Sequence, residues 1–213
     1  MSRQLSIGRT RPDVRARHAR EREARHRGLL DATRALLEEL PWSRVTIELI
    51  AERAGVTRTA FYKHFIDRRA LLLELLDEIA AQLEAIPAPW EGTPDGDPET
   101  LLRRAVAVLV DTFRVHGRLL RALADEATHD DEVERRYAEL GRRLSAGVAE
   151  RILRDVAAGN STLTDPEEVA TALVWMNERY LQQRFGRPPL GDPERAADAL
   201  AEIWIRTVYR ERA

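Results

Sequence analysis

Apolar residues recur along most of the chain with the spacing of an α-helix. Alanine, leucine, arginine and glutamate fill these stretches, and alternation of β-branched residues over five or more positions is absent. The pattern predicts an all-α protein with essentially no sheet. Breaks at proline, glycine and short polar clusters divide the chain into about nine predicted helices, at roughly 20–40, 46–54, 57–64, 67–86, 98–116, 118–127, 131–157, 166–185 and 193–211.

Three of these helices begin with the same triplet, Asp-Pro-Glu, at residues 97–99, 165–167 and 192–194. The aspartate can accept hydrogen bonds from the N–H groups of the first turn, and the proline has no N–H to leave unpaired there. The glutamate favours the positive end of the helix dipole. Each triplet therefore predicts a helix N-terminus.

Two short helices are predicted between Thr46 and Phe65. Thr46 can cap the first, Gly55 can supply a left-handed turn, and Val56 can fill the angle between them. Their outward side carries hydroxyl, aromatic and basic side chains, which we call the reading face: Thr57, Arg58, Thr59, Tyr62, Lys63 and His64. These groups suit phosphates and major-groove base edges. The pattern predicts a helix-turn-helix, although a Gly-Val corner also occurs in helical bundles that bind no DNA.

Charge is distributed unevenly along the chain. The whole sequence has 34 basic and 36 acidic residues, for a net charge of -2, yet residues 1–27 contain nine arginines and three acidic residues. A chain with one basic end and an acidic remainder is expected when the basic end binds a polyanion. Residues 1–19 are predicted to form a disordered arm. Its arginines either reach into a minor groove of the DNA or belong to a solvated tail that makes no such contact; the candidates are Arg9, Arg11, Arg15 and Arg17.

Composition argues against several other classes of protein. Without cysteine there are no disulfides, thiolate nucleophiles or thiolate zinc sites. No apolar run approaches a membrane span and no signal peptide is evident, so we expect a cytoplasmic protein with no membrane partner. His129 stands beside Asp130 and Asp131, which are better explained as a helix cap than as a metal site. We expect no catalytic residues, metal or cofactor.

The segment GVTRTAFYKHFIDRRALLLELL, at residues 55–76, resembles the TetR family of bacterial transcriptional regulators. The resemblance implies a three-helix DNA-binding domain at 20–66 and a ligand-sensing and dimerisation domain at 67–213. It also implies a repressor that binds a palindromic operator in double-stranded DNA as a homodimer and is released by a small lipophilic effector. The implied DNA contacts are Arg44, Thr46, Thr57, Arg58, Thr59, Tyr62, Lys63, His64 and Arg68.

The two last helices have apolar faces that are too wide for solvent, so we expect them to form a four-helix bundle with a second subunit. The segment ALVWMNERY, at 172–180, and the later Ile203-Trp204-Ile205 resemble the EthR-like branch of that family, the ethionamide-monooxygenase repressors. This resemblance implies a hydrophobic channel lined by Leu102, Leu109, Phe113, Tyr137, Leu144, Trp175, Met176, Asn177, Tyr180 and Trp204. Gly141, Gly147 and Val174 stand where that branch has larger or more polar residues.

Some alternatives remain open at this stage. Asn177 can anchor a ligand carbonyl, or it can bond to a neighbouring helix backbone. Other functions also fit the sequence. The protein can be a DNA-binding protein of this fold that needs no ligand, or an activator of this fold. A small all-α enzyme is a further alternative, which the motifs support less.

Overall fold

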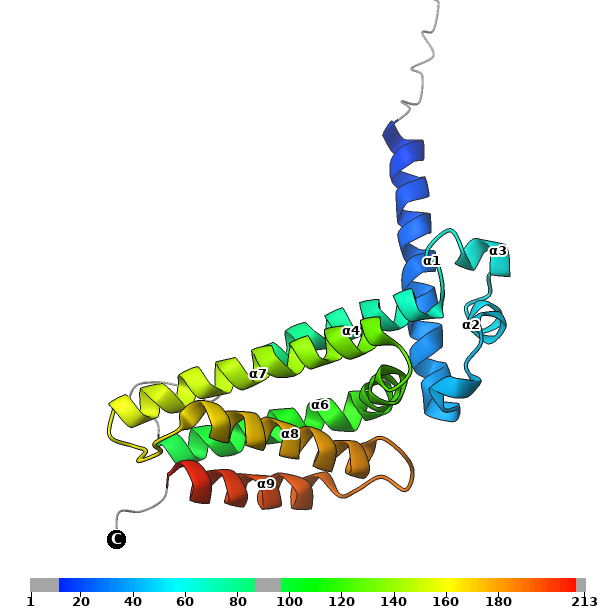
Figure 1. The fold of residues 1–213 in the computed structure, drawn as a ribbon. Coiled ribbons are helices and arrows are strands. Elements are labelled where there is room, and N and C mark those ends of the chain that lie inside the picture. The colour runs from blue at the N-terminus through cyan, green and yellow to red at the C-terminus, as the bar shows by residue number, and fades with distance from the viewer. Residues whose placement is uncertain (1–11, 87–96, 210–213) are drawn as a thin grey trace, which may run out of the picture. The chain divides into compact units, whose positions relative to one another are not determined.

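The structure, a computed structural model, describes residues 12–86 and 97–209 (Figure 1). Within these ranges every regular element is helical and none is a strand, which confirms the all-α prediction. The elements are α1 (Pro12–Glu39), the 3-10 helix η1 (Trp42–Arg44), α2 (Ile47–Arg53), α3 (Arg58–Phe61), α4 (Arg68–Glu84), α6 (Pro98–Ala127), α7 (Asp131–Ala157), α8 (Pro166–Phe185) and α9 (Pro193–Val208). The chain forms two compact units, Met1–Leu71 and Leu72–Ala213.

In the first unit, α2 packs against both α1 and α3 (Figure 1). Their core is closed by apolar side chains that have no exposed surface: Leu29, Val45, Ile50 and Phe61. Burying each such side chain contributes roughly 1.5–3 kcal/mol, which is what holds helices as short as α2 and α3 in place.

Helix α1 begins at Pro12, eight residues before the predicted start. The prediction of a disordered arm is therefore wrong for residues 12–19, and residues 1–11, which include Arg9 and Arg11, lie outside the described part. Ion pairs one turn apart support the helix, with Arg17 Nε 2.8 Å from Glu21 Oε1 and Arg27 Nε 3.1 Å from Glu23 Oε1. Each exposed pair of this kind adds a small stabilisation to the helix.

The turn between α2 and α3 has the predicted local chemistry. Thr46 Oγ1 caps α2 by accepting a hydrogen bond from the backbone N–H of Leu49 at 3.3 Å. Gly55 has φ = 66°, the left-handed conformation that glycine adopts without a steric penalty. Thr57 Oγ1 then caps α3 by accepting from the N–H of Ala60 at 3.1 Å. These contacts confirm the predicted helix-turn-helix geometry.

The second unit is built from α6, α7, α8 and α9, which pack side by side, together with most of α4 (Figure 1). The three predicted caps are confirmed. Asp97, Asp165 and Asp192 each accept a hydrogen bond from an N–H of the first turn, with N···O distances of 3.0, 3.2 and 3.0 Å.

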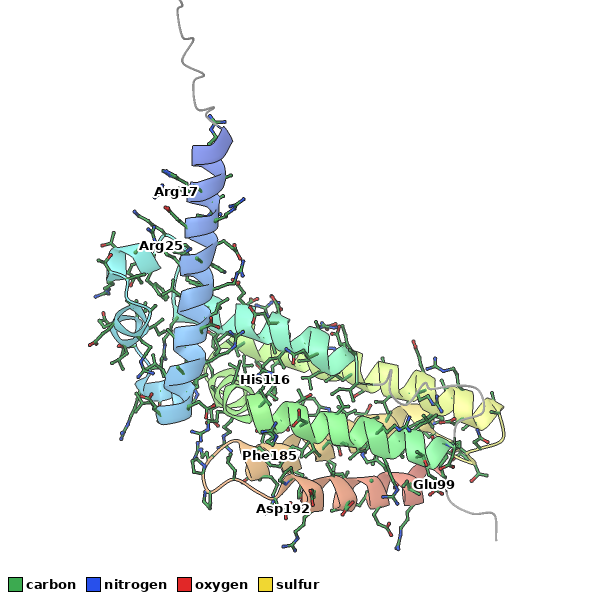
Figure 2. The ribbon with its side chains drawn as sticks, turned by 180° about the vertical axis from the view of Figure 1, so that it is seen from behind. Arg17, Arg25, Glu99, His116, Phe185 and Asp192 are labelled. Atoms are coloured by element: carbon green, nitrogen blue, oxygen red, sulfur yellow. The ribbon has the colours of Figure 1, made fainter. Side chains whose placement is uncertain are left out.

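The predicted break near Gly117 is wrong, because α6 runs unbroken through this position. Gly117 is buried where α6 meets the end of α8, and a Cβ atom there would lie 2.7 Å from the carbonyl oxygen of Phe185. Glycine is present because two backbones approach closely at this point. Figure 2 labels Phe185 at this end of α8.

Candidate nucleic-acid interface and ligand cavity

The reading face lies on and just after α3. Its members are exposed, except for His64, which is half-buried, and Arg44 and Thr46 are exposed as well. Phe61 and Phe65, which are 0% and 4% exposed, anchor the segment to the core. The outward placement predicted for the reading-face side chains is thus confirmed for all of them except His64.

Arg58 makes its contacts within the first unit. Its Nη1 lies 2.8 Å from Glu48 Oε1 on α2, and its Nη2 donates a hydrogen bond to the Tyr62 hydroxyl at 3.3 Å. The guanidinium carbon lies 5.7 Å from the centroid of the Tyr62 ring. An exposed ion pair of this kind contributes little to stability, so a phosphate or a base edge can displace Glu48 at little cost.

Arg68 makes contacts that stabilise the fold of the first unit. Its Nη1 donates to the carbonyl oxygens of Trp42 at 3.0 Å and Val45 at 2.8 Å, and the guanidinium carbon lies 4.7 Å from the Trp42 ring centroid. Asp67 Oδ1 caps α4 by accepting from the N–H of Ala70 at 2.7 Å. These contacts tie η1 to the start of α4, and the predicted phosphate contact of Arg68 remains a prediction.

Helix α1 brings further positive charge to the reading face. The His26 ring stacks on Phe65 with centroids 4.7 Å apart and lies 5.6 Å from the His64 ring. Burial lowers the pKa of His64, and the nearby charges of His26, Arg22, Arg25 and Lys63 lower it further. Figure 2 shows Arg25 and Arg17 projecting from α1. Arg22 and Arg25 were not among the predicted contacts, although the charge count of the first 27 residues pointed to this region.

A cavity of about 110 Å³ lies within the second unit. Most of its wall is apolar, and its residues come from α4 and the turn after it, α6, α7, α8 and α9. The described lining residues are Leu83, Ile86, Leu102, Ala105, Val106, Leu109, Phe113, Leu120, Tyr137, Leu140, Gly141, Leu144, Val148, Val174, Trp175, Asn177, Glu178 and Trp204.

Most of the predicted channel residues line this cavity: Leu102, Leu109, Phe113, Tyr137, Leu144, Trp175, Asn177 and Trp204. Met176 and Tyr180 are not among the described residues that line it, and their contact with a ligand stays a prediction. These two residues lie one helical turn apart on α8, on a side of the helix that does not face the cavity. Gly141 and Val174 are in the wall, whereas Gly147 is not.

Asn177 is held by a side chain rather than by a helix backbone. Its Oδ1 accepts a hydrogen bond from Trp204 Nε1 at 3.1 Å, and Asn177 is 4% exposed. The bond joins α8 to α9 across the cavity wall. Oδ1 retains a second lone pair and the amide nitrogen carries two N–H groups, so a ligand can hydrogen-bond to Asn177 at either atom.

One polar residue of the wall, Glu178, was not predicted from the sequence. Glu178 Oε1 accepts hydrogen bonds from the Tyr137 hydroxyl at 2.8 Å and from Gln182 Nε2 at 2.5 Å. Burial raises the pKa of Glu178, although these bonds oppose the shift, and burial next to this carboxylate raises the pKa of Tyr137 well above its usual range. Nothing in the sequence pointed to Glu178 as a cavity residue, because most glutamates face solvent.

The family comparisons match both units. Residues 29–75 match the family described as "Bacterial regulatory proteins, tetR family", and residues 102–210 match "Transcriptional regulator EthR, C-terminal domain". The chain belongs to the TetR family. The resemblance to this family and to its EthR-like branch is thereby confirmed.

Two relatives of this TetR-family chain are both described as the HTH-type transcriptional regulator EthR. The protein of Mycobacterium tuberculosis (strain ATCC 25618 / H37Rv) is 32% identical over 190 residues, which cover 88% of each chain. That of Mycolicibacterium smegmatis is 26% identical over 188 residues, covering 87% of this chain and 86% of the relative.

Solved structures show the same fold. The TetR-family regulator PfmR of Thermus thermophilus superposes with a TM-score of 0.70 at 19% identity, covering 86% of this chain and 99% of PfmR. NalD of Pseudomonas aeruginosa, described as the secondary repressor of the MexAB-OprM multidrug efflux pump, gives a TM-score of 0.69 at 23% identity. That match covers 89% of this chain and 100% of NalD.

This TetR-family chain is therefore a helix-turn-helix transcriptional regulator and not an enzyme, because its domains and relatives are regulators. Regulators of this family bind DNA as dimers and respond to small-molecule effectors. Asp130 caps α7 as predicted, accepting from the N–H of Glu132 at 3.0 Å. The part of the chain that the structure describes holds no cluster of three or more side chains placed to bind a metal, and no helix with the length and apolarity of a membrane span.

Proposed function

We propose that this regulator is a repressor that binds an inverted-repeat operator as a homodimer, and that a small lipophilic molecule in the cavity releases it. In this proposal residues 20–66 bind DNA and residues 67–213 sense the ligand and dimerise. The DNA contacts are the reading face together with Arg44, Thr46 and Arg68.

The main support for effector control is the cavity itself. A wall that draws apolar side chains from α4, α6, α7, α8 and α9 will exclude polar molecules and favour a lipophilic one. A ligand that prefers one arrangement of these helices shifts the population toward that arrangement. Reciprocity then requires operator DNA to weaken ligand binding by the same factor.

An exposed apolar side chain on α9 supports dimerisation through the last two helices. Ile203 is 43% exposed, which is high for an isoleucine. Covering it in an isologous interface would remove it from water and would set two reading faces a fixed distance apart. Half-sites about 34 Å apart, one turn of B-DNA, would match such a pair.

Operator binding can be tested by fluorescence anisotropy with inverted-repeat duplexes taken from the region upstream of the gene. We expect binding that weakens steeply with salt, because each neutralised phosphate releases counterions. Arg58→Ala should weaken binding about tenfold to hundredfold if Arg58 reads a base. Arg114→Ala, which removes an exposed arginine on α6 paired with Asp111, is the matched control and should leave the affinity unchanged.

Effector control can be tested with lipophilic amides, esters and acyl thioesters. A compound that binds the native state raises the midpoint of thermal unfolding, and the same compound should dissociate the duplex. Failure to bind any inverted repeat at low salt would refute the operator proposal. Compounds that raise the midpoint without releasing DNA would refute effector control.

A further inference from the structure

One carboxyl group stands in the mostly apolar wall of the cavity. Among the described lining residues, Glu178 alone carries an acidic side chain, and only Tyr137 and Asn177 besides it have polar groups of hydroxyl or amide type. Placing a carboxylate against an apolar cavity is unfavourable unless the charge has a partner. The position of Glu178 therefore bears on which ligands the cavity accepts.

The partners of Glu178 satisfy only one of its two oxygens. Tyr137 and Gln182 both donate to Oε1, and within residues 12–86 and 97–209 no hydrogen bond to Oε2 is present. A carboxylate can accept about four hydrogen bonds, so it retains capacity for more. The Tyr137 and Gln182 bonds also fix the orientation of the side chain at the wall.

Cationic side chains act on Glu178 only from a distance. Arg179 and Arg121 lower its pKa through their charge, yet no ion pair to Glu178 within 4.0 Å occurs in the described part of the chain. Arg121 instead pairs with Asp125, with Nε 2.8 Å from Oδ1. The negative charge at the wall thus lacks a direct counter-charge.

Aromatic rings surround the same space. Four described lining residues are aromatic: Phe113, Tyr137, Trp175 and Trp204. The faces of such rings attract a cation, and most strongly where water is excluded. Rings and carboxylate together favour a positive charge, and the carboxylate repels a negative one.

We propose that the effector cavity selects lipophilic molecules that carry a protonated amine, and that Glu178 pairs with that amine while the apolar wall holds the rest. This inference rests on the proposed function, because it names the ligand class for the same cavity. The volume of about 110 Å³ restricts the apolar part to a slender chain or a single ring.

The test uses three probes with the same apolar chain and different charge: hexylamine, hexanol and hexanoate. At about pH 8 the amine is protonated and the acid is ionised. Binding to the full-length protein is measured by calorimetry and by the fluorescence of the tryptophans that line the cavity. Glu178→Gln keeps an oxygen that can accept from Tyr137 and Gln182 but removes the charge. Glu167→Gln, at an exposed position near the start of the same helix, is the matched control.

We expect wild type and Glu167→Gln to bind hexylamine more tightly than hexanol, and hexanoate most weakly. In Glu178→Gln the preference for the amine over the alcohol should fall by about tenfold or more, the effect of losing one charge-assisted bond. Binding of hexanol by this variant should remain, which shows that the cavity is intact.

Two results would overturn the inference, and they differ in what they say of the proposed function. Equal binding of hexylamine and hexanol by wild type, whatever the variant does, would show that the charge of Glu178 plays no part in ligand selection. The proposal that the cavity binds lipophilic molecules would be unaffected. Failure of all three probes to bind would remove the cavity as a site for small lipophilic molecules, and the proposed effector control with it. The comparison in wild type needs no variant, so equal binding would overturn the inference even if Glu178→Gln does not fold.

Discussion

Gly117→Ala is expected to destabilise the second unit, although alanine is the better helix former. The added Cβ would lie 2.7 Å from the carbonyl oxygen and 2.9 Å from the carbonyl carbon of Phe185, both backbone atoms. Forcing such atoms apart costs typically about 1–3 kcal/mol. Replacing glycine inside a helix regains at most about 1 kcal/mol. Because both Phe185 atoms are backbone atoms that cannot rotate away, the cost should lie in the upper half of that range, and the net change should be a loss of roughly 1–2 kcal/mol in the free energy of unfolding.

Gly147→Ala is the matched control, because this glycine is also inside a long helix, α7, and a Cβ there would meet no atom within 4 Å. It should gain about 0.5–1 kcal/mol. Urea unfolding followed by circular dichroism, at one fixed protein concentration, measures both changes. Equal or greater stability of Gly117→Ala relative to wild type would refute the claim that close approach of α6 and α8 requires glycine at this position.

Three further predictions concern the first unit. Glu48→Gln should raise operator affinity about two- to fivefold at low salt in anisotropy titrations, because Arg58 no longer has to leave an ion partner; unchanged affinity would contradict this. Arg68→Ala should lower the free energy of unfolding by about 1–3 kcal/mol in urea titrations, since two carbonyls lose their donor. Because the pKa of His64 is lowered in the folded state, its neutral form contributes stability that is lost as the pH falls from about 7 to about 5. His64→Gln should flatten that part of the pH–stability profile, and an unaltered slope would count against the assignment.

Local sequence chemistry was enough to predict the helix-turn-helix and the helix starts that carry a capping side chain. Thr46, Gly55 and Asp97 act on backbone groups within a few residues of themselves, so their effect can be worked out without the rest of the fold. The reading face followed in the same way, because Phe61 and Phe65 define the buried side of so short a helix.

Features that depend on contacts between distant segments were predicted less well. Gly117 looked like a break because the backbone of Phe185, 68 positions later, cannot be foreseen from local propensity. Met176 and Tyr180 have the helical spacing of a buried face, but packing decides which side of α8 meets the cavity. Glu178 was missed for the same reason.

The bond between Trp204 and Asn177 has a consequence for measurements of ligand affinity. It links the inside of the cavity to α8 and α9, the helices proposed to join two copies of the chain. A ligand that competes for Asn177 would loosen one helix from the other and so change how well the two copies fit. By thermodynamic linkage, apparent ligand affinity would then vary with protein concentration over the range where the dimer dissociates.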